Sequence, residues 1–268
     1  MSKPQISMGV RRFGRVNWLG LATLARREMR RFLKIWSQTV LAPLVTAGLF
    51  LAIFTIAIGP ARPDVMGVPF VTFLAPGLLM MTVIQNAFAN TSSSIMAAKV
   101  QGNIVDTLMP PLSPLETVLG YLAGGIGRGL FVAVGMALAM WLVLGIPVSH
   151  PLWALAFLIL GGAFMGCLGI LAAVMALKLD QMAAITNFVI TPLAFLSGTF
   201  YSITALPPAL QGVSRINPMF YLIDGARYGF IGRSDADPVL GLIAVSATLA
   251  GLMTLAWWVF RTGFRLKA

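Results

Sequence analysis

Acidic residues are scarce in this sequence: eight of its 268 residues are aspartate or glutamate, against 19 lysines and arginines. Each of the eight can be placed outside the long apolar runs that make up most of the chain. A carrier driven by protons or sodium ions usually needs a carboxylate at membrane depth. The scarcity therefore argues against an ion-driven carrier and for energy supplied by another subunit.

Cysteine and histidine are nearly absent as well. A single cysteine, Cys167, excludes an intrachain disulfide and is expected to be a small packing residue. The only histidine, His150, has no companion for a metal site, and no H-E-x-x-H, G-x-S-x-G or membrane aspartate pair is present. The phosphate-binding motif G-x-x-x-x-G-K-[ST] is missing too. We therefore predict no catalytic residue, no metal and no cofactor in this chain, which is not an enzyme.

Apolar residues are abundant, at 58% of the chain, with a mean hydropathy of +0.89. Six runs are each long enough to cross a hydrocarbon core of about 30 Å as a helix. We expect an all-α membrane protein whose six transmembrane helices are Ser37–Ile58, Phe70–Ile95, Thr117–Leu144, Pro151–Leu177, Met182–Phe200 and Pro238–Phe260.

The basic residues are unevenly divided between the two sides of such a six-span protein. Fourteen of the 19 fall before the first span, after the last, or in the two loops on the same side. Because positive residues accumulate on the cytoplasmic side, both termini are predicted to be cytoplasmic, in a multi-pass protein of the bacterial inner membrane. An RNA-binding arm at residues 1–16 is an alternative reading of the charge, but we expect no nucleic acid partner.

Residues 17–36 form the clearest amphipathic pattern. Trp18, Met29 and Trp36 fall on one helical face, and Arg30 and Lys34 on another. Such a helix lies flat among lipid headgroups. We therefore divide the chain into a cytoplasmic arm with an interfacial helix, 1–36, and a transmembrane domain, 37–268.

Two loops and one charge stand out in the transmembrane part. After the second span, residues 98–111 carry a short helical pattern that ends at two prolines, a possible handle for a soluble motor. Before the last span, the apolar patches 206–216 and 218–231 are each too short to cross and predict a re-entrant or interfacial helix pair at the outer leaflet. In the second patch Asp224 and Arg227 are three residues apart and can pair on one helix face. Arg128, within the third span, should face protein, water or a headgroup.

These features together resemble the permease subunits of type-2 ATP-binding cassette (ABC) exporters, over nearly the whole chain. The resemblance is carried by the basic interfacial helix, by the segment from Gly102 to Leu108-Met109-Pro110-Pro111-Leu112-Ser113, and by the block after the fifth span. That block runs from Phe195-Leu196-Ser197-Gly198-Thr199-Phe200-Tyr201 through Asn217-Pro218 to Tyr221, Asp224 and Arg227. The chain looks most similar to the branch with nodulation lipo-oligosaccharide and multidrug exporters.

The resemblance implies a homodimer, with one separate ABC ATPase bound to each copy and ATP with Mg held in that partner. It implies that the coupling to the ATPase is made by Lys99, Gln101, Gly102, Asn103, Ile104, Asp106 and Leu108, together with Arg27, Arg30 and Arg31. It also implies that the translocation path and its outer gate are lined by Phe195, Ser197, Phe200, Tyr201, Asn217, Tyr221, Asp224 and Arg227. Gln101 stands where family members often carry an arginine or glutamate.

The function implied is ATP-driven export of an amphipathic, lipid-linked or glycan substrate across the inner membrane. Two other readings stay open. One is a proton-driven secondary carrier, for which Asp224 is the acid that could approach membrane depth. The other is a non-transporting membrane scaffold with an ATPase partner.

Overall fold

The computed structural model describes residue 14 and the ranges 16–58 and 63–266, which are built from helices without a β-strand. The predicted arm at residues 1–13 and 15, and the charges of Arg62 and Lys267, lie outside the described residues. The long helices are α3 (Phe70–Val100), α5 (Pro114–Leu144), α6 (Pro151–Met175) and α11 (Pro238–Thr262). The shorter helices are α1 (Trp18–Lys34), α2 (Ala42–Ile53), α4 (Ile104–Leu108), α7 (Leu179–Ile185), α8 (Thr191–Phe195), α9 (Pro208–Ile216) and α10 (Pro218–Ile231).

Within residues 16–58 and 63–266, five helices are long and apolar enough to cross a membrane, and they coincide with five of the six predicted spans. The first of them, Ser37–Ala57, begins as a π-helical turn at Ser37–Leu41 and continues as α2. The remaining predicted span, Met182–Phe200, is a continuous helical stretch of α7, a π-helical turn at Thr186–Ile190, and α8. It ends at Phe195, ahead of a turn in which Gly198 has φ +74°, so it is shorter than expected. A sixth crossing stays a prediction.

Two helices form the centre of the bundle. In α3 and α6, 78% and 72% of the most apolar window is buried, against 28% or less in the other three long segments. α3 and α6 pack along each other at short distance because Gly166 and Gly169 of α6 leave room for Thr91 of α3, whose hydroxyl donates to the Gly166 carbonyl at 2.9 Å. These glycines of α6 therefore serve close helix packing.

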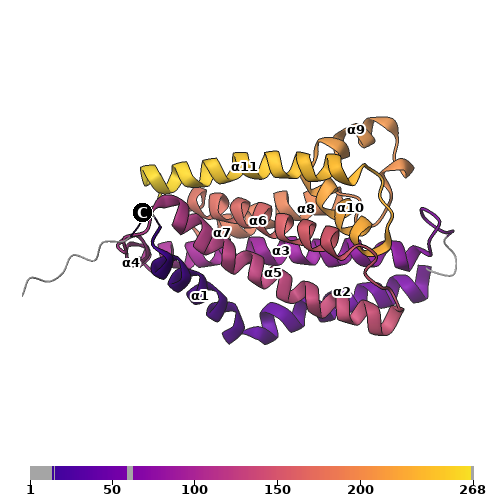
Figure 1. The fold of residues 1–268 in the computed structure, drawn as a ribbon, viewed down its shortest axis with the longest axis horizontal. Coiled ribbons are helices and arrows are strands. Elements are labelled where there is room, and N and C mark those ends of the chain that lie inside the picture. Colours follow the sequence, from indigo (N-terminus) through magenta and orange to yellow (C-terminus); the bar gives the residue numbers. More distant parts are fainter. Residues whose placement is uncertain (1–13, 15, 59–62, 267–268) are drawn as a thin grey trace, which may run out of the picture.

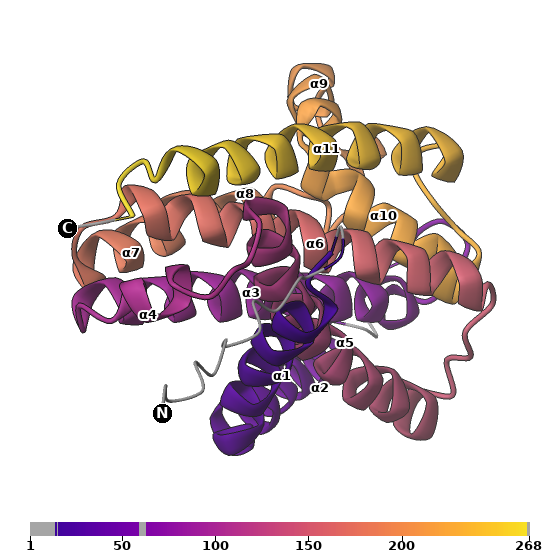
Figure 2. The same cartoon turned by 60° about the vertical axis from the view of Figure 1, so that its left-hand side comes forward.

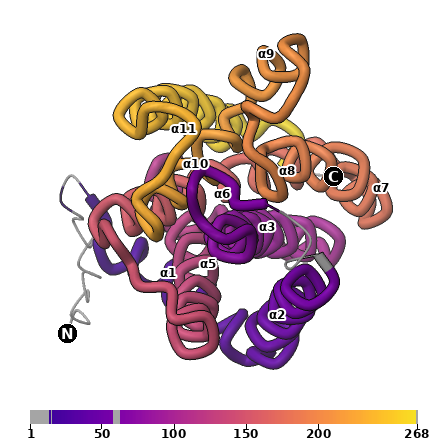
Figure 3. Tube along the Cα trace, turned by 90° about the vertical axis from the view of Figure 1, so that its right-hand side faces the viewer, coloured from indigo at the N-terminus to yellow at the C-terminus, as the bar shows by residue number. Residues whose placement is uncertain are grey.

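The peripheral helices surround this centre. Viewed along the bundle, α2 lies on the side opposite α11, with α3 and α6 between them (Figure 3). Only 11% of the first span's window is buried, so most of its surface is left for lipid or for another chain.

The two ends of the bundle are different (Figure 1). α1, α4 and the last turns of α11 lie at one end, and α9 and α10 lie toward the other. The segments predicted to bind an ATPase and those predicted to form an outer gate are therefore at opposite ends. Which end faces the cytoplasm stays a prediction from the charge pattern.

α1 crosses the bundle obliquely (Figure 2) and has three faces instead of the two expected. Trp18 and Trp36 are 71% and 58% exposed, as lipid-facing residues should be. A separate strip with Leu24, Glu28 and Phe32 is buried against the bundle. The interfacial helix is thus also a packed element, seated on α5.

The predicted helix pair before the last span is present as α9 and α10, broken at Pro207-Pro208 and at Asn217-Pro218. The two helices are not alike in burial. α9 is largely exposed, whereas α10 packs against α6, α3 and α11 and buries most of its residues. α10 comes this close because Gly225 and Gly229 lie directly on Phe157 and Ala154 of α6.

Candidate functional site

A cleft of about 950 Å³ opens between α1 and the segment that joins α3 to α4. Its α1 wall is basic, and the facing wall offers the side chains of Gln101, Asn103 and Asp106. The basic residues are Arg26, Arg27, Arg30, Arg31 and Lys34. The structure therefore brings the two predicted coupling segments together at one cleft, although they are about 70 residues apart in the sequence.

The coupling segment itself has an exposed and an anchored side. Gln101, Gly102 and Asn103 are exposed in the turn before α4, and Gly102 adopts φ +72°, a conformation suited to glycine. Ile104 is buried and Leu108 packs against the core, so these two hold the short helix on the bundle.

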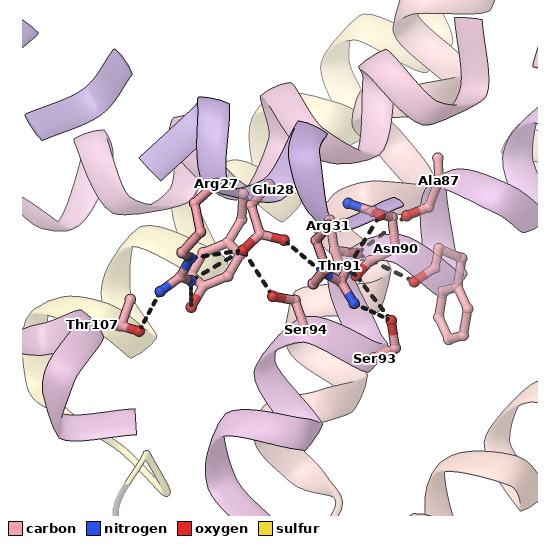
Figure 4. A network of polar contacts seen from close by, with 11 residues as sticks. Arg27, Glu28, Arg31, Ala87, Asn90, Thr91, Ser93, Ser94 and Thr107 are labelled. Atoms are coloured by element: carbon pink, nitrogen blue, oxygen red, sulfur yellow. Dashed lines mark hydrogen bonds and ion pairs between the residues drawn. The ribbon is translucent and has the colours of Figure 1, made fainter. Parts of the chain in front are cut away.

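Glu28 of α1 is the centre of a buried polar network that joins α1 to α3 (Figure 4). Its side chain has no exposed surface, and its Oε1 accepts from Ser94 Oγ at 2.9 Å and from Arg27 Nη2 at 3.0 Å. The other oxygen lies 3.4 Å from Arg31 Nε. Arg31 continues the network to α3, donating to the Asn90 carbonyl at 2.5 Å.

Arg27 extends the same network to α4. Its Nη1 donates to Thr107 Oγ1 at 3.1 Å, and the Tyr121 hydroxyl of α5 lies 3.5 Å from Nη2. Burial lowers the pKa of Arg27, but Tyr121 and Glu28 outweigh this effect and hold its pKa above the ordinary value. Arg27 is thus a permanent charge that connects α1, α4 and α5.

The seat of α1 on α5 is made by two glycines. A Cβ on Gly120 would lie 2.5 Å from Leu24, and one on Gly124 would collide with the Cβ of Glu28. At the start of α1, the backbone N–H of Asn17 donates to Glu116 Oε1 at 2.7 Å. These contacts fix the depth and direction of α1 relative to α5.

Lys99 differs from the other predicted coupling residues. Its side chain is buried, and its ammonium donates to the carbonyls of Ala173, Val174 and Ala176 at 2.8–3.1 Å. These carbonyls end α6 and would otherwise lack partners. The structure places Lys99 as a cap that fastens the end of α6 to α3, away from the cleft.

At the opposite end, the predicted pair of Asp224 and Arg227 is confirmed, with Nη1 and Oδ1 3.1 Å apart. Arg227 also donates to the Gly198 carbonyl at 2.7 Å and stacks 4.0 Å from the Phe73 ring centre. Asp224 accepts from the backbone amides of Asp235 and Ala236, each at 2.9 Å. The pair ties α10 to the turn after α8 and to the loop before α11.

The other predicted gate residues gather around that turn. Phe195 and Phe200 stack with ring centres 5.3 Å apart, and Phe200 reaches Phe54 of the first span at 5.8 Å. Asn217 begins α10 and donates to Ser197 Oγ at 2.9 Å. Tyr201 and Tyr221 are half-buried near this turn and on α10.

A polar face of α3 lies between two grooves. One groove, of about 460 Å³, separates this face from the α7–α8 stretch, and the other, of about 350 Å³, separates it from the first span and Phe200. Gln85 and Asn86 line both. The polar stretch of the second span therefore combines two roles: Thr91 and Ser94 serve packing, and Gln85 and Asn86 face open grooves.

Sequence reasoning did not select Glu28, and for the polar stretch from Gln85-Asn86 to Ser94 it favoured a packing role over a role in lining the path. A signal for Glu28 was available, because it is the one acid among the five bases of α1 and shares a helical face with Leu24 and Phe32.

Comparison with known proteins identifies the family of this chain. The profile of the ABC-2 type transporter family matches residues 20–231, which include both the cleft and the gate. The chain belongs to the ABC-2 type transporter family. It is thus the membrane subunit of an ABC transporter, as the sequence predicted.

Individual relatives agree with this assignment. The inner membrane transport permease YadH of Escherichia coli K12 is 35% identical over 251 residues, which cover 94% of this chain and 98% of that protein. Nodulation protein J of Rhizobium leguminosarum bv. viciae is 26% identical over 257 residues, covering 91% and 94%. The predicted family, the similarity to the nodulation branch and the multi-pass inner-membrane location are confirmed.

Proposed function

We propose that this permease is half of the membrane part of an ATP-driven exporter. Two copies form a homodimer, and each copy binds one separate ABC ATPase that holds ATP and Mg. The observation that carries the proposal is the basic cleft between α1 and the α3–α4 turn. There the proposed coupling segment is linked to the spanning helix α3 by two contacts: Arg27 donates to Thr107 of α4, and Glu28 accepts from Ser94 of α3. A motion imposed on α4 would be passed to α3 through these contacts.

The path for the substrate is proposed to lie on the polar face of α3, between the first span and the α7–α8 stretch. The two grooves with Gln85 and Asn86 support this location, as does the exposed first span, which leaves room for a second copy. A groove of mixed amide and apolar lining suits an amphipathic, lipid-linked or glycan substrate.

The state of Asp224 supports ATP over an ion gradient as the energy source. Both oxygens of this carboxylate are bonded, to Arg227 and to two backbone amides. A proton relay needs a carboxylate that is free to exchange protons with the path, whereas these three bonds hold the Asp224 carboxylate in place as a structural link.

Disulfide crosslinking tests the ATPase contact. Asn103→Cys places a thiol on the exposed coupling turn, and Val213→Cys places one on exposed α9 as a control, while the native Cys167 is fully buried. With a co-expressed ATPase that carries cysteines around its docking cleft, we expect a crosslink at position 103 and none at 213. A functional complex without a crosslink at 103 refutes the coupling assignment.

Transport in liposomes tests the rest. We expect ATP-dependent flux by the complex and none by the permease alone under a proton or sodium gradient. Uphill flux by the permease alone would identify a proton-driven secondary carrier, and ATP hydrolysis without flux would identify a membrane scaffold.

A further inference from the structure

Arg128 is a charge within a spanning helix that has no acidic partner. The three ion pairs of the described residues do not include it, and its one hydrogen bond runs from Nε to Asn86 Oδ1 at 3.0 Å. The charge that acts on it is the like charge of Arg31. Its side chain is half-buried, and its two Nη groups are left with their donors unused by described residues.

The acids of the chain are all accounted for elsewhere. Glu28 is shared by Arg27 and Arg31, Asp224 is held by Arg227, and Asp235 and Glu116 bind backbone and hydroxyl groups. The remaining four, Asp64, Asp106, Asp180 and Asp237, lie outside the five long spans. The three arginines around Glu28 and Asn86 therefore carry two positive charges more than the protein neutralises.

The depth of Arg128 follows from the seat of α1. α1 crosses α5 at Gly120 and Gly124, and its basic face marks the level of the headgroups. The contact of α1 with α5 continues to Met29 at Gly127 and to Phe32 at Phe131, so Arg128 lies level with the last turns of α1. The guanidinium thus lies at the boundary between headgroups and acyl chains, where an unpaired charge attracts an anionic headgroup.

The guanidinium is also held in one orientation. The Asn86 amide donates to the Thr82 carbonyl at 2.9 Å, which directs its oxygen toward Arg128 Nε. The bond to Asn86 uses Nε alone, so the two Nη groups of the planar guanidinium remain as a fork suited to two oxygens of one oxyanion. Asn86, which holds Arg128, also lines both grooves of the proposed path and so connects the guanidinium to them through one side chain.

From this geometry we propose that Arg128, positioned by Asn86 and reinforced by the charge of Arg31, binds the phosphate-type headgroup of an amphiphile at the inner leaflet. Arg128 contacts the oxyanion, Asn86 orients the guanidinium, and the acyl chain lies along the exposed apolar surface of α5, of whose most apolar window 28% is buried. That this amphiphile is also the exported substrate rests on the proposed function, whereas the binding site does not.

Native mass spectrometry of the purified chain, without an ATPase, tests the site. The probes are dioleoylphosphatidylglycerol and dioleoylphosphatidylcholine, which share their acyl chains and differ in net charge. We expect the wild type to retain the anionic lipid preferentially. Arg128→Gln removes a charge-assisted hydrogen bond and should weaken that binding about tenfold, which is about 1.4 kcal/mol, while binding of the zwitterionic lipid should be unchanged.

Two variants complete the test. Arg215→Gln removes a charge from the exposed surface of α9 and should bind like the wild type. Arg128→Lys keeps the charge but lacks the fork, so it should fold and show a smaller loss. Equal retention of the two lipids, or anionic lipid binding unaffected by both Arg128 substitutions, would overturn the proposal.

Competition separates the possible sources of the oxyanion. Dodecyl phosphate should displace the anionic lipid, and inorganic phosphate at the same concentration should not. Equal displacement by both would replace the amphiphile with a soluble anion and refute the proposal in this form. Failure of export with headgroup binding intact would count only against the proposed function.

Discussion

Substitution of Glu28 by glutamine tests whether α1 is held on the bundle by its buried charge. The glutamine has the same shape, so packing against Gly124 is kept. It removes the negative charge, however, that Arg27 and Arg31 share at 3.0 and 3.4 Å, and it turns an amide NH₂ toward one of these donors. The guanidiniums then lie beside a buried neutral group, which favours release of α1 into solvent.

The size of the effect follows from the burial of the partners. Removing one member of a fully buried ion pair costs about 3–5 kcal/mol, while exposed pairs contribute about 1 kcal/mol or less. Glu28 has no exposed side-chain surface, but Arg27 and Arg31 keep 47% and 34% of theirs, so water screens part of the loss. We therefore expect about 2 kcal/mol, which raises the population with α1 released roughly 30-fold.

Limited trypsin digestion in detergent measures that population. α1 contains five cleavage sites, Arg26, Arg27, Arg30, Arg31 and Lys34, and a folded helix must open before it is cut. When opening is fast relative to cleavage, the rate follows the open population. Cleavage within α1 should therefore be faster in the variant by about the same factor of 30.

Asp180→Asn is the matched control, because it removes an acid of the same charge from an exposed position in α7. It should leave cleavage of α1 unchanged. If Glu28→Gln is cut no faster than this control, the buried charge does not hold α1, and the proposed relay from α4 to α3 loses its central residue.

Three further predictions concern packing and caps. Gly124→Ala should lower the free energy of unfolding by about 1–3 kcal/mol, because its Cβ collides with Glu28. Gly251→Ala, in open space, should be neutral or slightly stabilising. Equal melting temperatures of the two variants would contradict close packing of α1 on α5 at Gly124. Lys99→Met should lower the free energy of unfolding by about 1.5–3 kcal/mol, because it leaves three carbonyls at the end of α6 without a donor. Lys178→Met, at an exposed position, should leave it unchanged. A melting temperature like that of this control would show that the cap is dispensable. Arg227→Gln should destabilise the folded protein by about 3–5 kcal/mol, because it leaves the buried Asp224 charge unpaired. The measurement is the loss of folded protein after heating. Recovery equal to that of the wild type would refute a structural role for the pair.

Much of the architecture was predictable because it depends on composition over long windows. Apolar runs of 20 or more residues report the solvent that surrounds them, and five of the six expected spans are found. Prolines at 207–208 and 218 marked the starts of α9 and α10 correctly, since proline is tolerated in the first turn of a helix but not in its interior. The stretch near 182–200 was less tractable because its end is set by the Gly198 turn.

The candidate sites were only partly predictable. The pairing of Asp224 with Arg227 follows from a spacing of three on a helix, and it was found. The role of Lys99 does not follow from the sequence, because its partners are carbonyls more than 70 residues away. Every residue type carries a backbone carbonyl, so the residue types at positions 173, 174 and 176 give no sign that Lys99 binds there.

The sequence by itself determined the class of protein, the approximate spans, the amphipathic character of α1 and the absence of an ATP-binding motif, because each of these is written in the identity or local periodicity of neighbouring residues. The tertiary structure alone decided which face of α1 is buried, which groups Glu28 and Lys99 contact, and that Arg128 has no acidic partner. These features depend on which helices lie side by side. Burial removes water as a hydrogen-bond partner, so the role of a buried polar side chain is set by residues far away in the sequence.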